Sequence, residues 1–122
     1  MVIKQKKLSS LRFQWDAKMK QFNPYYAVIF TSTMTQETDG YAEMAKQMET
    51  LAEKQKGFLG IDSARSDVGI TVSYWESLEA IKNWKANSEH LLAQEKGRNQ
   101  WYDWYSVRIC KVERAYEFQN KN

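Results

Sequence analysis

The segment YYAVIFTSTM, residues 25–34, constrains the fold more than any other part of this chain. Aromatic and β-branched residues dominate it, which predicts a β-strand. Side chains alternate between the two faces of a strand. The first half of this strand is therefore apolar on both faces, with Tyr26, Val28 and Phe30 on one and Ala27 and Ile29 on the other. Such a strand has to be covered from both sides, so its sheet needs an apolar layer on each face.

Two further segments carry the spacing of amphipathic helices. In the first, Asp39 is the predicted N-cap and Gly57 ends the helix. Its apolar stripe consists of Tyr41, Met44, Ala45, Met48, Leu51 and Ala52. Ser77 is the predicted cap of the second helix, whose stripe consists of Leu78, Ile81 and Trp84. A separate helical stretch is predicted from Ser88, as its cap, to about Glu95.

The remaining strands are predicted from alternation and turn residues. FLGIDSAR, residues 58–65, and GITVSYW, residues 69–75, flank the turn SDVG, and SVRICKVERAYEF, residues 106–118, is the predicted last strand. The order βαββαβ predicts an α+β, ferredoxin-like fold, in which two helices pack on one face of a four-stranded antiparallel sheet. Because the helices cover only that face, a second copy of the chain is the simplest cover for the other, through a two-fold interface.

Residues 1–23 differ in composition from the rest. They are rich in Lys, Gln and Ser and hold six basic residues against Asp16 alone, whereas the whole chain has a net charge of +3. We interpret them as a mobile or loosely docked basic arm that ends near Pro24, followed by one domain over residues 24–118 and a short tail over residues 119–122. The domain itself is net negative, so nucleic acid is an unlikely partner.

Several classes of function find no support in the sequence. No stretch approaches the about 20 apolar residues of a membrane span, and no signal peptide is recognisable. The single cysteine, Cys110, excludes an internal disulfide, which fits a cytoplasmic protein, and its apolar neighbours predict a buried, inert thiol. One His and one Cys cannot build a conventional zinc site, and no nucleotide-binding glycine motif is present.

Five segments together resemble the antibiotic biosynthesis monooxygenase (ABM) family, and in particular its bacillus-type stand-alone members of unassigned substrate. They are YYAVIF, GFLGIDSAR, GITVSYWESLEAIKNWK, EHLLAQEKGR and WYDWYSVRICKVERAY, within residues 24–118. The resemblance implies a dimeric α/β barrel in which two sheets pack face to face. It also implies a monooxygenase without cofactor, acting on a small aromatic or conjugated carbonyl compound whose own enolate or phenolate reacts with O₂. The alternatives are a non-enzymatic protein of the same fold that binds a small hydrophobic ligand or haem, and a structural dimer module.

Haem-degrading relatives allow a sharper comparison. Their strand-end Trp and the helical Trp nine residues later resemble Trp75 and Trp84. Their haem-ligating His, however, falls at Gln94, and their strand-one Asn falls near Phe30 or Thr31, which argues against haem degradation. A shifted ligand is conceivable at His90, one helical turn before Gln94, although a solvent-facing or hydrogen-bonded His is the simpler interpretation.

The resemblance directs the search for site residues to the elements near the sheet. Candidates for a base or an oxygen-polarising group are His90, Tyr74, Arg65, Arg98 and Arg108. Candidates for the wall of an aromatic pocket are Trp84, Trp101, Phe30, Trp75 and Trp104. Each has a structural alternative. Trp84 would fill the core between helix and sheet, Trp101 and Trp104 would belong to an apolar stripe, and Arg65 would pair with an acid at a hairpin edge.

Overall fold

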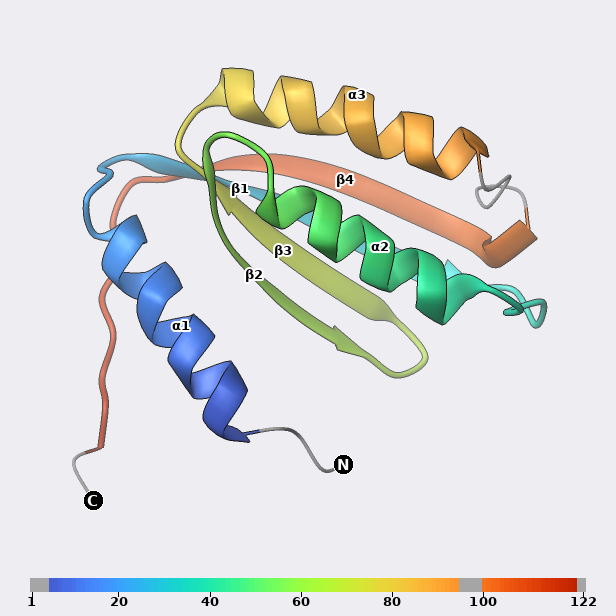
Figure 1. Cartoon of the computed structure of the whole chain (residues 1–122), viewed down its shortest axis with the longest axis horizontal. Helices are drawn as coiled ribbons and strands as arrows, with labels where there is room; N and C mark the ends of the chain where they lie inside the picture. The colour runs from blue at the N-terminus through green and yellow to red at the C-terminus, as the bar shows by residue number, and fades with distance from the viewer. Residues whose placement is uncertain (1–4, 95–99, 121–122) are drawn as a thin grey trace.

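The computed structural model describes residues 5–94 and 100–120, with side chains for residues 12–92 and 100–120. Within these residues the chain forms α1 (Gln5–Met19), β1 (Tyr25–Met34), α2 (Tyr41–Glu53), β2 (Phe58–Arg65), β3 (Gly69–Trp75), α3 (Leu78–Gln94) and β4 (Tyr102–Val112) (Figure 1). The described strands form one antiparallel sheet in the order β2-β3-β1-β4. This confirms the predicted α+β, ferredoxin-like fold.

One face of the sheet lies against α2 and α3, which run side by side (Figure 1). The strand registers place four cross-strand rows on this helix-facing side: Arg65–Gly69–Ser32–Tyr105, Ser63–Thr71–Phe30–Val107, Ile61–Ser73–Val28–Ile109 and Phe58–Trp75–Tyr26–Lys111. Phe58 and Trp75 of the last row belong to the first core cluster, which they form with Ala52, Ala80 and Ile81. A second core cluster, at the other end of the sheet, is formed by Met44, Leu92 and Trp101.

Helix α1 corrects the interpretation of the N-terminal arm. The part of the arm within Gln5–Met19 is a helix, and Trp15 packs against the first core cluster with its ring centroid 6.1 Å from that of Phe58. Trp15 also lies directly over Gly60, which pairs with Tyr74 on the face opposite α2 and α3. Part of the second sheet face is thus covered by the chain itself. The sequence of the arm shows no obvious helical period because exposed apolar residues such as Phe13 lie between the few buried ones.

The helix boundaries agree only in part with the predicted caps. Ser77 caps α3 as predicted, since its Oγ accepts a hydrogen bond of 3.1 Å from the backbone N–H of Ala80. Ser88 does not start a separate helix: α3 is continuous through it, and its hydroxyl donates to the carbonyl of Lys85. Gly40, with φ of 84°, occupies the N-cap position of α2 in place of Asp39.

The last strand is shifted from its predicted position. β4 begins at Tyr102 and ends at Val112, whereas residues 106–118 were expected to form it. The segment after Val112 leaves the sheet and returns to α1, where Glu117 forms an ion pair of 3.1 Å with Lys20. A register shift lies between Thr33 and Met34, where β1 pairs with the start of β4. No helix in the described part of the chain is long and apolar enough to cross a membrane.

Candidate functional site

An aromatic cluster lies at the end of the helix-facing side where α2 begins and β4 starts. Its rings belong to Phe30, Tyr41, Trp101, Tyr102 and Tyr105. Phe30 stacks on Tyr105 with centroids 5.2 Å apart, and the other pairs meet edge to face at 5.5–5.9 Å. Such offset and edge-to-face arrangements are the favoured geometries of aromatic pairs. The cluster is therefore a packed surface of rings with three phenol hydroxyls.

The register shift in β1 explains how two tyrosines of β4 reach the same cluster. Tyr102 and Tyr105 are three residues apart, so a regular strand would direct them to opposite faces. Thr33 pairs with Trp104, but Met34 pairs with Tyr102, so one residue of β4 is left out of the pairing. Both tyrosine rings consequently contact Phe30. Alternation alone predicts only one of them at the site.

Arg65 supplies a positive charge beside the cluster. Its Nη2 donates a hydrogen bond to the Oγ of the fully buried Ser32, and its Cζ lies 5.7 Å from the ring centroid of Tyr41. Arg65 is at the end of β2 and Ser32 is in β1, with Gly69 of β3 between them in the same cross-strand row. The side chain crosses β3 above Gly69 to reach Ser32.

Tyr102 is the most perturbed phenol of the cluster. Burial raises the pKa of Tyr102 far above its ordinary value, the neighbouring Tyr41 hydroxyl raises it further, and Arg65 opposes the shift. Loss of solvation penalises the charged phenolate, so the hydroxyl keeps its proton at neutral pH. Tyr102 can therefore donate a hydrogen bond but cannot serve as a general base there.

An open apolar strip continues from the cluster along β4. Tyr105, Val107 and Ile109 face the helix side in consecutive rows, and Phe30 is the cross-strand partner of Val107. Val107 and Ile109 are 51% and 53% exposed although both are large and apolar. Phe30, Tyr105, Val107 and Ile109 thus offer an apolar surface that ends at the phenols and at Arg65, an arrangement suited to a flat apolar molecule with one polar end.

The structure brings together three of the residues predicted for the site. Phe30 and Arg65 meet through Tyr41 and Tyr102, and Trp101 lies behind Tyr41 at a centroid distance of 5.9 Å. Trp101 is almost fully buried, and its Nε1 donates a hydrogen bond of 2.7 Å to the carbonyl of Asp39. It supports the cluster from the core.

Trp75 and Trp84, also predicted for the pocket wall, lie at the opposite end of the sheet. Trp75 is 0% exposed and stacks on Trp84 at 5.7 Å with an interplanar angle of 23°. Its Nε1 donates to the Oγ of Ser73 at 2.8 Å. The two rings fill the space between α3 and the sheet, as the structural alternative for Trp84 expected.

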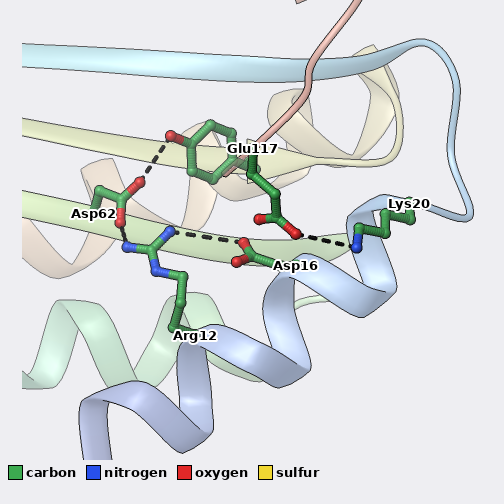
Figure 2. Close-up of polar contacts among 6 residues, drawn as sticks. Arg12, Asp16, Lys20, Asp62 and Glu117 are labelled. Atoms are coloured by element: carbon green, nitrogen blue, oxygen red, sulfur yellow. Dashed lines mark hydrogen bonds and ion pairs between the residues drawn. The ribbon is translucent and has the colours of Figure 1, made fainter. Parts of the chain in front are cut away.

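Tyr74 lies on the other face of the sheet, under α1. Its hydroxyl donates a hydrogen bond of 2.8 Å to Asp62, which is paired with Arg12, and Arg12 in turn lies 3.8 Å from Asp16 (Figure 2). Burial raises the pKa of Tyr74, and Tyr25 beside it adds to the shift. These contacts join α1 to the sheet, away from the aromatic cluster.

The other candidates are dispersed. His90 is exposed on α3, Arg108 is exposed with its Nη1 donating to Ser106, and Trp104 is half-exposed on the face opposite the helices. Arg98 and the side chain of Gln94 lie outside the described residues. Within the described part of the chain, His, Cys, Asp and Glu side chains do not gather into a group able to hold a metal ion.

Sequence reasoning missed seven residues of the site: Ser32, Tyr41, Gly69, Tyr102, Tyr105, Val107 and Ile109. Tyr41 was assigned to the apolar stripe of a helix, which is also where it lies, so its contact with Arg65 was not foreseeable from spacing. A signal was available for Gly69, since a glycine inside a strand often marks the close approach of another group.

Comparison with known proteins agrees with the fold and the sequence pattern. The family model "Antibiotic biosynthesis monooxygenase" matches residues 24–96. YqjZ, an uncharacterized protein of Bacillus subtilis, is 51% identical over 98 residues, which cover 79% of this chain and 86% of YqjZ. Jasmonate monooxygenase ABM of Pyricularia oryzae is 27% identical over 92 residues, 71% of this chain and 43% of that protein.

Two solved structures share the fold at low sequence identity. A mutant of SnoaB, a cofactor-independent oxygenase from Streptomyces nogalater, matches with a TM-score of 0.62 and 10% identity over 75% of this chain and 95% of SnoaB. PA3566 from Pseudomonas aeruginosa matches with a TM-score of 0.59 and 16% identity over 78% of this chain and 98% of PA3566.

Proposed function

This chain belongs to the antibiotic biosynthesis monooxygenase family, and from that premise we propose that it is a cofactor-independent monooxygenase acting on a small aromatic or conjugated carbonyl compound. A jasmonate monooxygenase among its relatives and a cofactor-independent oxygenase among its structural neighbours support an oxygenase. The proposed site is the aromatic cluster with the open apolar strip.

One observation carries the proposal: the charge of Arg65 and the phenols of Tyr41 and Tyr102 meet at one end of an exposed apolar strip. A flat substrate on Phe30 and Val107 would direct its carbonyl or phenol oxygen at these groups. A guanidinium and a phenol that keeps its proton both stabilise an oxygen that becomes negative. The site therefore favours the enolate or phenolate form of the substrate.

That anion is the species that reacts with O₂. The CH₂ group next to the substrate carbonyl loses a proton to solvent, and the resulting carbanion passes one electron to O₂. The resulting substrate radical and superoxide combine to form a C–O bond, and proton uptake gives a hydroperoxide. Loss of water then leaves a new carbonyl, so that one CH₂ group and one O₂ yield one C=O and one H₂O. In this scheme Arg65 stabilises the enolate and Tyr102 donates a hydrogen bond to the developing oxygen anion.

Oxygen uptake with a panel of polyphenols, quinols and fused-ring ketones tests the proposal. Charge-assisted hydrogen bonds contribute about 1.5–3 kcal/mol, so Arg65→Gln should lower kcat/KM by roughly 10- to 100-fold. Arg114→Gln removes an exposed arginine that follows β4 outside the sheet and is the matched control. Uptake no faster than the protein-free rate across the panel would contradict an oxygenase. Saturable binding without uptake would favour the alternative of a non-enzymatic ligand-binding protein.

We also propose that two copies pack through the sheet face opposite α2 and α3. α1 covers the β2 side of this face, and beyond it Ile70 and Trp104 are 46% and 50% exposed. A strand carrying a half-exposed Trp on an open sheet face is a typical core of a protein interface. Light scattering should give twice the mass of the chain for the wild type and the single mass for Trp104→Glu. Leu78→Glu, which places the same charge at an exposed site on α3, should leave the mass unchanged.

A further inference from the structure

We propose that Gly69 is a positioning residue for Arg65, and that through it the site selects ligands with an anionic end over neutral ligands of the same shape. The inference rests on the proposed function only for the location of the ligand, on the aromatic cluster and the open apolar strip. It concerns a binding preference, which can be measured without turnover.

The distance that Arg65 has to span explains the need for a glycine. Arg65, Gly69 and Ser32 are successive partners in one cross-strand row, so two strand spacings of about 4.8 Å separate Arg65 from Ser32. The guanidinium reaches Ser32 by lying flat on β3. A Cβ at residue 69 would fall on the Cζ, Nη2 and Nε atoms of Arg65, well inside contact distance. Any side chain there displaces the guanidinium.

The backbone of Gly69 does not itself require a glycine. Positive φ values are found at Gly40 and Gly57 among the described residues, whereas Gly69 has the ordinary conformation of a strand. Alanine can adopt this conformation, and glycine inside a strand is unfavourable because it loses more conformational freedom on folding. The space occupied by Arg65 is thus the feature of the structure that calls for a glycine here.

No acid among the side chains that the structure describes forms an ion pair with the charge that Gly69 positions. The structural alternative for Arg65 was an ion pair with an acid at the hairpin edge, but within the described residues its polar partner is the hydroxyl of Ser32 and its ring contact is Tyr41. A guanidinium has five N–H donors, and the bond to Ser32 engages one. A planar anion such as a carboxylate, a phenolate or an enolate matches the remaining donors.

The length of the apolar strip indicates the size of the apolar part of the ligand. Tyr105, Val107 and Ile109 extend over five residues of β4, which is four steps or about 14 Å at the rise of an antiparallel strand. This length is greater than that of one six-membered ring, so the strip fits a fused or linked aromatic system. The inferred ligand class is an extended aromatic compound with one anionic oxygen group at its end.

Two naphthalene probes of the same shape test the inference: 2-naphthoate, which is anionic, and 2-naphthamide, which is neutral. We expect Gly69→Ala and Arg65→Gln each to weaken binding of the anionic probe about tenfold, and of the neutral probe less than twofold. The double variant should be no weaker than either single variant, because both remove the same interaction. Ser66→Ala, an exposed change in the same hairpin, should bind both probes like the wild type.

Three results would overturn the inference: unchanged binding of the anionic probe to Gly69→Ala, an equal loss of both probes, or additive losses in the double variant. Urea denaturation of each variant ensures that binding is compared between folded proteins. Charge selection without oxygen uptake would support the positioning role and refute the oxygenase. Oxygen uptake by a Gly69→Ala variant with unchanged kcat/KM would refute the positioning role and leave the oxygenase standing.

Discussion

Trp15→Ala should destabilise the protein, although the residue lies before the part of the chain that matches the family model. The Trp15 ring packs edge to face on Phe58 and covers Gly60, where a Cβ would lie 3.0 Å from that of Trp15. A fully buried Trp removes about 150–250 Å² from water, which corresponds to about 4–6 kcal/mol at 25 cal/mol per Å². Trp15 is partly exposed, and extended-chain areas overstate burial, so we expect a loss of about 2–3 kcal/mol.

Urea denaturation followed by far-ultraviolet circular dichroism measures this loss without depending on tryptophan fluorescence. Phe13→Ala is the matched control, because it removes an aromatic ring that is 75% exposed on the same helix and should cost less than about 0.5 kcal/mol. Gly60→Ala should destabilise the wild type, and should do so less once Trp15 is alanine, because the contacts with the ring are then gone and only the contact with the Cβ of residue 15 remains. Equal losses for the Trp15 and Phe13 variants would refute the docking of α1 on the sheet.

Two further predictions concern the stability of Gly57→Ala and the pKa of Asp16. Gly57→Ala should cost about 2 kcal/mol in urea denaturation, because φ is +90° and the new Cβ would lie 2.6 Å from that of Ala80; a loss under about 0.5 kcal/mol would contradict this. Carboxyl NMR should show the pKa of Asp16 above its ordinary value, chiefly through burial, with Glu117→Gln lowering it and Arg12→Gln raising it further. The stabilisation that the protonated Asp16 contributes should therefore be complete below its unfolded pKa of about 4 and be lost as the pH rises through its folded pKa. A pKa of Asp16 that neither variant moves would argue against the arrangement in Figure 2.

The elements that could be predicted from the sequence are those whose pattern is local. β1 was predicted with its observed bounds because alternation begins directly after Pro24. The cap at Ser77 was predicted because it depends on one residue and its immediate neighbours, whereas α2 ends at Glu53, before the predicted stop at Gly57. α1 was missed because its buried stripe is narrow, and only contact with Phe58 makes Trp15 a core residue.

The site was predicted less completely because it depends on registers between distant strands. Phe30 and Arg65 could be proposed from their strands, but the row that joins Arg65 to Ser32 exists only once β2, β3 and β1 are paired. The shift between Thr33 and Met34 has no signature in the sequence, yet it places Tyr102 in the cluster. That a residue is aromatic did not indicate whether it belongs to the site, as Tyr102 does, or to the core, as Trp75 does.

Side chains of β1 alternate between the two faces of the sheet, and this links the proposed ligand site on the helix-facing side to the proposed dimer contact on the opposite side. Ser32 faces the helix side and holds Arg65, whereas Thr31 and Thr33 face the other side, where they pair with Ile70 and with Trp104. Because α1 occupies the β2 side of that face, the second copy of the proposed dimer would lie over Ile70 and Trp104. In the proposed dimer, the partner would therefore pack directly behind Ser32. Contacts between two copies would then hold the backbone on which Arg65 depends, so that assembly and ligand binding would stabilise the same stretch of β1.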